Sequence, residues 1–431
     1  MSFYSLIVEV TRRLIAFDSE ATRITFHNMN KDKGPGGLME RVHEMMNNHL
    51  APGPGLDSVA AIQMEGMADM LNAGTPTDGR PITTNLYAWQ RHIFGVCNMR
   101  AIYGPENIFV THPETEKAFW DFEEGMLGLV VDIVPHITTR KAFKARRRVL
   151  DALIDFVKTK RYKKASDLII DRVDTNLAFG MSQEMCGHSE LILIFGIVGN
   201  AVPSNFWLIA NIFSRPELLQ RIREEVQKAL SIEVPPKQVD SGLTRRLCTV
   251  DSKTISRSCP LLYSCYRETL RSISLLTSAR LVLEDTLLAG KYLLRKDSVV
   301  QIAGGVIHLD PAVWGEDAES FNAERFLAKD SDGKQAVATP LPNGVPSPAF
   351  RAFGGGTVIC PGRHFAQSEL MTFAAVLALG FDILDIDGGP LRLPAKDDTR
   401  IPLSVMKPVH DPKVRIQRRK GWEHVEWNIR V

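Results

Sequence analysis

The sequence predicts a mainly α-helical protein with small β-sheets, formed by one domain over residues 1–431. Residues 114–164 carry apolar side chains at helical spacing almost throughout. Residues 191–214 form an uncharged run that is long enough for a helix through the core of a large domain. The alternation typical of strands is confined to residues 280–310 and to short segments after residue 381.

Composition excludes several classes of protein. The apolar share of 44% and the charged share of 24% are ordinary for a folded chain. The formal charge is 52 minus 50, or +2, which is too balanced for a general nucleic-acid-binding protein. The six cysteines are scattered without a CxxC pair, so we expect a reducing compartment and neither a zinc site nor a disulfide framework. Residues 1–17 carry Glu9, Arg12 and Arg13 and resemble an amphipathic helix rather than a secretory signal.

Further elements follow from turn residues and spacing. Helices are predicted over residues 56–71, 87–102, 216–230 and 260–271, and strands over residues 291–294 and 298–302. Ser214 is the expected N-cap of the third of these helices. Residues 231–257 are polar and predict a surface connection. Residues 328–349 predict a long loop, which in a compact domain normally serves a site.

The basic residues between Lys141 and Lys164 allow two interpretations. Such runs are usually solvated helix faces, which is the interpretation that we favour. A docking surface for an acidic redox partner is the alternative.

The segment from Phe353 to Ala366, FGGGTVICPGRHFA, is the motif on which the functional prediction depends. Three consecutive glycines favour a loop whose backbone can pass close to a flat group. After Pro361 and Gly362 the apolar spacing predicts a helix, so Cys360 precedes a helix N-terminus, where a thiol pKa is lowered. A thiolate in such a loop can serve as the single axial ligand of an iron centre and promotes O–O cleavage.

The order Phe–x–x–Gly–x–x–x–Cys–x–Gly resembles the cysteine-ligand loop of the cytochrome P450 family. The resemblance implies the cytochrome P450 fold, haem b as cofactor, Cys360 as the metal ligand, and Phe353 and Gly354 as part of the cofactor-binding loop. Many members carry Arg or His two residues before the cysteine, where this chain has Val358.

Two arginines and one glutamate extend the resemblance. Glu268 and Arg271 are three residues apart on a predicted helix and can pair. Arg325 follows in Phe321-Asn322-Ala323-Glu324-Arg325-Phe326, which resembles the family's PERF segment with Ala323 in place of its proline. In the family these positions form a buried Glu–Arg–Arg network beneath the cysteine loop, and one carboxylate can satisfy two forked guanidinium groups.

Other basic residues are candidates for the haem propionates. By the resemblance, Arg280 reaches one propionate through a guanidinium–carboxylate pair. His43, His49 and Arg80 are the candidates for the second contact. His308 also lies at a familiar position, and we interpret it as a structural histidine in a turn.

The uncharged helix departs from the pattern of oxygen-activating members, which carry an acid followed by Thr or Ser. Val202 and Pro203 stand at those positions, and Pro203 is expected to open the helix by removing a backbone bond. Asn200 and Ser204 remain as polar groups that can shape the distal pocket or act catalytically, although Asn200 can equally well only cap the kink. This arrangement resembles the branch of sterol 7-alpha and 12-alpha hydroxylases, prostacyclin synthase and related fungal enzymes.

The resemblance implies a monooxygenase that oxidises a lipophilic small molecule, such as a terpenoid, sterol-like or polyketide intermediate of secondary metabolism. It implies an NADPH–cytochrome P450 reductase as partner, no nucleic acid, and a place at the endoplasmic reticulum membrane surface. The family's N-terminal anchor and first strands have no counterpart here, so a cytoplasmic or peripheral location is expected if this form is complete. Three alternatives stay open: a same-fold isomerase or dehydratase without a reductase, a truncated haem-binding relic, and a membrane-spanning scaffold around residues 191–213.

Overall fold

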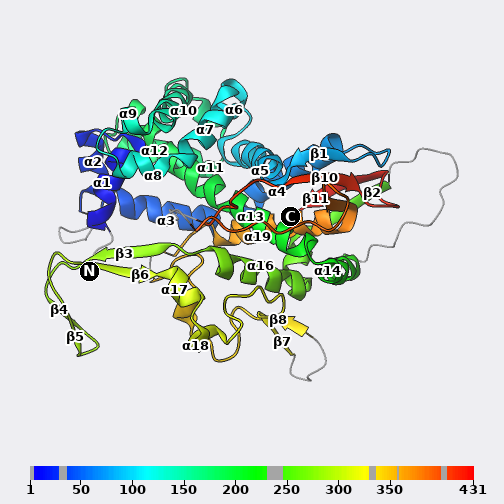
Figure 1. Ribbon diagram of the computed structural model, residues 1–431. Coiled ribbons are helices and arrows are strands. Elements are labelled where there is room, and N and C mark those ends of the chain that lie inside the picture. Colours follow the sequence, from blue (N-terminus) through cyan, green and yellow to red (C-terminus); the bar gives the residue numbers. More distant parts are fainter. Residues whose placement is uncertain (1–3, 29–35, 231–245, 330–335, 357–358, 399–404) are drawn as a thin grey trace. The chain divides into compact units, whose positions relative to one another are not determined.

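Helices make up most of the described chain and the sheets are small, as the sequence predicts (Figure 1). The computed structural model describes residues 4–28, 36–230, 246–329, 336–356, 359–398 and 405–431. The chain folds into two units. The first unit holds residues 1–55, 98–199 and 277–303, and the second holds residues 56–97, 200–276 and 304–431. A single domain over residues 1–431 stays a prediction.

The first unit is built around α10, whose buried face packs against α7 and α12. Its helices are α1 (Tyr4–Ile15), α2 (Ser19–Phe26), α3 (Leu38–Leu50), α6 (Ile108–Thr111), α7 (Glu114–Glu124), α8 (Met126–Val131), α9 (Pro135–Thr138), α10 (Arg140–Lys158), η1 (Arg161–Lys164), α11 (Asp167–Ala178) and α12 (Gln183–Ile194). Its strands are β3 (Thr277–Leu281), β4 (Thr286–Leu288), β5 (Tyr292–Leu294) and β6 (Val299–Ala303). β3 pairs with β6, and β4 pairs with β5, both antiparallel.

The second unit is built around α19, which contacts α13, α14, α15 and α16. Its helices are α4 (Pro54–Gly74), α13 (Asn200–Phe213), α14 (Pro216–Ala229), α15 (Ser252–Ser258), α16 (Pro260–Ile273), α17 (Gly304–His308), α18 (Pro311–Trp314), η3 (Ser347–Ala349) and α19 (Arg363–Gly380), and α5 (Leu86–Tyr103) continues from it into the first unit. Its strands are β1 (Ile82–Asn85), β2 (Arg246–Asp251), β7 (Leu327–Lys329), β8 (Ala336–Ala338), β9 (Phe381–Asp385), β10 (Lys413–Arg418) and β11 (Val425–Arg430). They form an antiparallel sheet of order β1-β10-β9, a parallel pair β11-β2 and an antiparallel pair β7-β8.

The predicted core helix is a continuous helix of 31 residues, Gln183–Phe213, made of α12, a π-helical segment η2 (Phe195–Gly199) and α13. Among the described residues it is the one helix that is long and apolar enough to cross a membrane, but 72% of its most apolar window is buried. Such burial is typical of a core helix rather than of the membrane-spanning alternative. Pro203 has no amide to bond to Gly199, and the π segment lies at that point of the helix.

Two connections contain structure that the sequence did not indicate. Within residues 231–257, where we predicted a surface connection, the described part forms β2 and α15, and Val250 and Ile255 are buried. Within residues 328–349, the predicted long loop contains the β7–β8 hairpin and η3. Both predictions were wrong because short strands such as β2, β7 and β8 become stable only through pairing with a partner strand and through packing, which local spacing does not reveal.

The start of α14 also differs from the prediction. Arg215, not Ser214, is the N-cap residue, and it makes no capping bond with its side chain. The Ser214 hydroxyl donates to the Asn211 carbonyl at the end of the preceding helix instead, at 3.4 Å. A serine between two helices can serve either helix, and here it serves the earlier one.

Candidate active site

The Cys360 loop connects a turn at Phe353 to the N-terminus of α19 in the second unit. The Cys360 amide donates to the Phe353 carbonyl at 2.9 Å, which closes the loop. Gly354 and Gly356 have φ values of +77° and +69°, where a side chain would be strained. Val358, where many members carry Arg or His, lies outside the described residues. The loop thus presents its cysteine directly before a helix, as predicted.

Cys360 is the one exposed cysteine, since the other five are buried. The protein atoms packed around its sulfur nevertheless raise the pKa of the Cys360 thiol. The amides of Gly362 and Arg363 and the Arg363 guanidinium act in the opposite direction but do not outweigh this desolvation. Our expectation of a lowered pKa from the helix N-terminus alone was therefore wrong. A bound metal ion would shift the balance, because a coordinating thiol is deprotonated.

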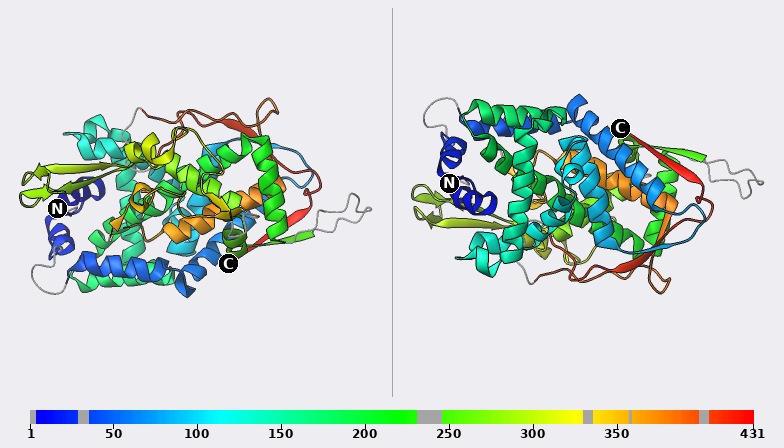
Figure 2. Two further views of the ribbon diagram at one scale, coloured as in Figure 1. Left: turned by 90° about the horizontal axis from the view of Figure 1, so that it is seen from below. Right: turned by 90° about the horizontal axis from the view of Figure 1, so that it is seen from above.

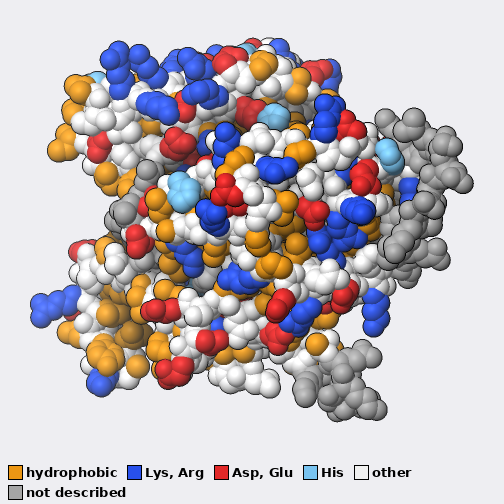
Figure 3. Space-filling model, turned by 45° about the vertical axis from the view of Figure 1, so that its right-hand side comes forward, with side chains coloured by type: hydrophobic (Ala, Val, Ile, Leu, Met, Phe, Trp, Pro, Cys, Tyr) orange, Lys and Arg blue, Asp and Glu red, His pale blue; other side chains and the backbone are white. Residues whose placement is uncertain are grey.

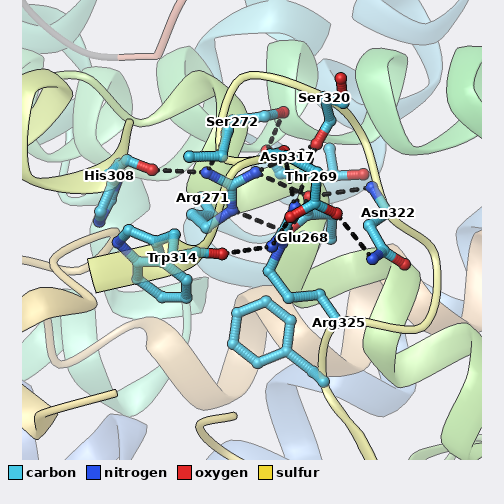
Figure 4. Close-up of polar contacts among 12 residues, drawn as sticks. Glu268, Thr269, Arg271, Ser272, His308, Trp314, Asp317, Ser320, Asn322 and Arg325 are labelled. Carbon is cyan, nitrogen blue, oxygen red and sulfur yellow. Dashed lines mark hydrogen bonds and ion pairs between the residues drawn. The ribbon is translucent and has the colours of Figure 1, made fainter. Parts of the chain in front are cut away.

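Glu268, Arg271 and Arg325 meet in one buried network in the second unit (Figure 4). Both nitrogen atoms Nε and Nη2 of Arg271 donate to the Glu268 carboxylate at 2.7 Å. The Arg325 Nε donates to the same two oxygens at 3.1 and 3.0 Å. The Glu268 and Arg271 side chains are completely buried. Because one buried charge faces two forked cations, removal of the carboxylate would leave Arg271 without an opposite charge and Arg325 with only the half-exposed Asp317.

The segment from Trp314 to Asn322 completes this network, although no sequence motif indicates this role. Arg271 donates to the carbonyls of Ala318 at 2.7 Å and Ser320 at 3.3 Å, and Arg325 donates to the Trp314 carbonyl at 2.8 Å. Arg325 also pairs with the Asp317 carboxylate at 2.8 Å. These acceptors are backbone carbonyl groups, which every residue has, so no sequence motif identifies them. Only the path of the folded backbone shows which carbonyls face the arginines.

The turn before Arg325 is held without the family's proline. The Asn322 side chain accepts a bond from the Glu324 amide at 3.0 Å, and the Arg325 amide donates to the Asn322 carbonyl at 3.1 Å. Asn322 also donates its own amide to Glu268 at 3.0 Å. An asparagine can fix such a turn through its side chain, so Ala323 is tolerated next to it.

His308 holds the network to the loop that leads into the cysteine motif, as a structural histidine would. Its carbonyl accepts from Arg271, and its Nε2 accepts from the Arg351 amide at 2.8 Å. Burial, together with the charge of Arg271, lowers the pKa of His308 from 6.5 to about 4. The imidazole is therefore neutral at physiological pH.

Acid should destabilise this unit through His308. The folded pKa of about 4 lies below the ordinary 6.5, so the unfolded chain binds more protons between these values and stability falls as the pH falls through that window. The loss should reach roughly 3 kcal/mol. His308→Gln keeps an acceptor for the Arg351 amide but does not titrate, so thermal unfolding at pH 7 and pH 5 should show a smaller pH dependence in this variant. An equal pH dependence in both proteins would assign the acid sensitivity to other groups.

The basic residues proposed for the propionates are far from the Cys360 loop in the sequence. Arg280 bonds to a backbone carbonyl, whereas His49 and Arg80 pair with aspartates. Arg280 lies on β3 in the first unit, opposite Val300, and donates to the Ala279 carbonyl at 2.8 Å. His49 bonds to Asp171 at 2.8 Å, and Arg80 pairs with Asp78 at 2.6 Å. Their part in cofactor binding stays a prediction.

Asn200 and Ser204 lie one turn apart at the start of α13. The Ser204 hydroxyl donates to the Asn200 carbonyl at 2.8 Å, so this proton is used within the helix. The Asn200 carboxamide is half-buried, and among the described residues it makes no hydrogen bond. Of the two side chains, only the Asn200 carboxamide therefore keeps its hydrogen-bonding groups available for a ligand.

The residues of the Cys360 loop fit a haem iron. The thiol is exposed, backbone amides of Gly362 and Arg363 point to its sulfur, and open space surrounds the position of a Cβ on Gly356. A single thiolate with amide donors is an axial ligand for haem iron. No group of three or more His, Cys, Asp or Glu in the described chain forms an alternative metal site.

Comparisons with known proteins agree with this geometry. The sequence profile of the family "Cytochrome P450" matches residues 126–398. The cytochrome P450 monooxygenase nodJ of Hypoxylon pulicicidum is 29% identical over 97% of this chain and 80% of its own length. Cytochrome P450 7A1 of Oryctolagus cuniculus is 26% identical over 90% of this chain and 76% of its own.

Among solved structures, the retinoic acid bound cyanobacterial CYP120A1 shares the fold with a TM-score of 0.66. It is 19% identical and covers 89% of this chain and 80% of that chain, so the likeness concerns the fold alone. The family match spans more than half of the chain and includes Cys360 and the Glu268–Arg271–Arg325 network. This chain therefore belongs to the cytochrome P450 family and is a monooxygenase, an oxidoreductase of that fold.

Proposed function

We propose that this enzyme is a haem-thiolate monooxygenase that oxidises a lipophilic small molecule. Its substrate is an intermediate of secondary metabolism of terpenoid, sterol-like or polyketide type, and its electrons come from an NADPH–cytochrome P450 reductase. The observation that carries the proposal is the single exposed thiol, Cys360, held before α19 by a loop with two glycines at positive φ.

The residues have separate roles in this proposal. Cys360 is the axial ligand of haem b, and Phe353 and Gly354 shape the loop that carries it. Glu268, Arg271 and Arg325 hold the backbone around this loop through His308 and Arg351. Arg280 binds one propionate, as a guanidinium can pair with a carboxylate in two places. When bound, haem supplies the oxidising chemistry, while the protein supplies the ligand, the pocket and the protons.

The exposed face of the long helix supports a lipophilic substrate. Ile192 is 40% exposed and Gly196 is exposed, and nothing lies within 4 Å of a Cβ placed on Gly196. Asn200 follows at the same spacing of four residues and brings one carboxamide to this face. We assign Asn200 to the orientation of the substrate or of a water molecule, and Ser204 to the shape of the helix through its bond to the Asn200 carbonyl.

The proposal is tested by reconstitution of the chain with haem. The reduced protein should give a carbon monoxide difference spectrum with the Soret band at the red-shifted thiolate position. With NADPH and the reductase it should convert members of a terpenoid, sterol and polyketide panel. Folded protein that takes up haem but yields no product, with the reductase or with peroxide as surrogate oxidant, would instead support a haem-binding relic.

A specific observation favours a second candidate, a same-fold isomerase or dehydratase. Val202 and Pro203 occupy the positions where oxygen-activating members carry an acid and an alcohol, and no carboxylate lies between Glu190 and Glu217. An isomerase needs neither dioxygen nor electrons. Conversion of a peroxide substrate without reductase or NADPH would therefore identify this activity, and a strict need for both would exclude it.

A further inference from the structure

Two amide side chains, Gln90 on α5 and Asn205 on α13, form a buried pair in the second unit. Both residues are 0% exposed. Charged side chains are spread over the face drawn in Figure 3, and amide side chains are likewise mostly exposed in proteins, so a completely buried pair needs a partner for each polar atom. The Asn205 Nδ2 donates to the Gln90 Oε1 at 2.8 Å, which satisfies one donor and one acceptor.

Two polar atoms of this amide pair remain without a protein partner. Among the described residues no group bonds to the Gln90 Nε2, which is a donor, or to the Asn205 Oδ1, which is an acceptor. Exchanging oxygen and nitrogen in both amides does not remove the mismatch, because two amides joined by one bond always leave an acceptor and a donor unused. An unsatisfied buried group loses its hydration without compensation. The amide pair therefore requires a ligand that both donates and accepts hydrogen bonds.

Helix α5 is fixed on both sides of Gln90. The Asp411 carboxylate accepts hydrogen bonds from two backbone amides in the first turn of α5, at 2.7 and 2.9 Å. Four residues after Gln90, the ring of Phe94 meets the Phe373 ring of α19 edge-on, with 5.2 Å between the ring centroids. In both views of Figure 2 the orange α19 lies among other helices, and its contacts with α13, α14, α15 and α16 place it in the interior of the second unit. Gln90 thus projects from a helix that is anchored in the core.

Helix α13 needs such an anchor because of its break at Pro203. Proline has no amide, so the first turn of α13 lacks one backbone hydrogen bond. Two side chains fasten the helix directly after this point. Asn205 bonds to α5, and the Trp207 Nε1 donates to the Met406 carbonyl at 2.9 Å. The orientation of α13 after the break therefore depends on side-chain contacts with neighbouring elements.

We infer that one internal water molecule binds between Gln90 and Asn205 and joins α5 to α13. Its oxygen accepts a hydrogen bond from the Gln90 Nε2, and one of its O–H groups donates to the Asn205 Oδ1. Water is the smallest ligand that both donates and accepts, and buried waters typically satisfy polar groups of this kind. Gln90 and Asn205 then act as positioning residues, which hold α13 and with it Asn200, the first residue of the helix. The inference does not depend on the substrate or on the reaction type.

A crystal structure of the full chain loaded with haem tests the water site directly. We expect electron density for a water oxygen at hydrogen-bonding distance from both the Gln90 Nε2 and the Asn205 Oδ1. In the double variant Gln90→Met, Asn205→Leu this density should disappear, because both polar partners are replaced by apolar side chains of similar length.

Unfolding equilibria test whether the two amides act as a unit. Either single variant, Gln90→Met or Asn205→Leu, leaves the other amide buried without its partner, so each should lower the folding equilibrium constant at least about 10-fold. The double variant removes both amides and should lose less than the product of the two single effects. Gln220→Met makes the same chemical change at an exposed position of α14 and should fold like wild type.

Hydrogen exchange separates a positioning role from a general loss of stability. Under native conditions the backbone amides of α13 should exchange at least about 10-fold faster in either single variant than in wild type, whereas those of α14 should be unchanged. A general loss of stability would instead speed exchange in both helices alike, and that result would contradict the positioning role.

Two further results would overturn the inference. One is a wild-type structure in which no water lies between Gln90 and Asn205, or in which their remaining polar atoms bond to other protein groups. The other is a double variant that loses as much as the product of the two single effects, since independent amides would share no ligand. If a single variant does not accumulate as folded protein, the wild-type crystal structure decides the question alone.

Discussion

Replacing Cys360 with serine should abolish both the red-shifted carbon monoxide band and monooxygenase turnover. A serine hydroxyl cannot supply the thiolate that the iron centre needs, and the other cysteines cannot replace it because they are buried. Burial also raises the pKa of Cys186 to about 12 and of Cys248 to about 11, which disfavours a thiolate at those positions. Difference spectra and product formation with reductase and NADPH measure the two losses.

Cys248→Ala is the matched control for this experiment. Cys248 lies on β2 and is 6% exposed, so its replacement changes packing but not the candidate ligand. The control variant should retain the spectrum of wild type. If Cys360→Ser kept the red-shifted band, the ligand would have to be another residue and the proposed site would be wrong. Equal unfolding temperatures of both variants would show that the spectral loss reflects ligation and not misfolding.

Replacing Glu268 with glutamine should destabilise the second unit by about 3 to 5 kcal/mol. The side chain keeps its shape but loses the charge that faces Arg271 and Arg325, and the Glu268 and Arg271 side chains are completely buried. Two cations would then share a buried site without a compensating carboxylate, apart from the half-exposed Asp317 beside Arg325. Urea or thermal unfolding of the purified protein measures the change.

Glu324→Gln provides the same chemical change at the surface. Glu324 pairs with Arg221 at 2.6 Å, and both side chains are more than half exposed, so this variant should lose less than about 1 kcal/mol. If Glu268→Gln does not accumulate as folded protein, Arg325→Lys keeps the charge but loses the forked contacts, and should lie between wild type and Glu268→Gln. Equal losses for Glu268→Gln and Glu324→Gln would contradict a buried network that holds the cysteine loop.

Local sequence features predicted the elements that carry the site. The apolar spacing after Gly362 predicted α19, and the helices at residues 87–102 and 260–271 begin and end within two residues of α5 and α16. The glycines of the cysteine motif predicted a loop with unusual backbone angles, which Gly354 and Gly356 adopt. These features are set by neighbours along the chain, so the sequence contains the information directly.

Strand pairing, the hydrogen bonds of Arg271 and the pKa of Cys360 depend on residues far away in the sequence, so only the tertiary structure decided them. β2 lies within a segment that we predicted to be a surface connection, yet it pairs with β11 at the C-terminal end, and no local pattern records this partner. The carbonyls of Ala318 and Ser320 accept from Arg271 only because the backbone returns to that point. Desolvation likewise depends on packed atoms, and it reversed the expected direction of the Cys360 pKa.

The sequence by itself therefore determined the mainly helical fold, the cysteine loop before a helix, and the three charged residues of the network. The tertiary structure decided how those charges are buried, which backbone groups satisfy them, and which apolar side chains of the first unit remain exposed. The physical reason is one of range: helix formation and backbone angles depend on nearby residues, whereas burial and charge compensation depend on every group that the folded chain brings together.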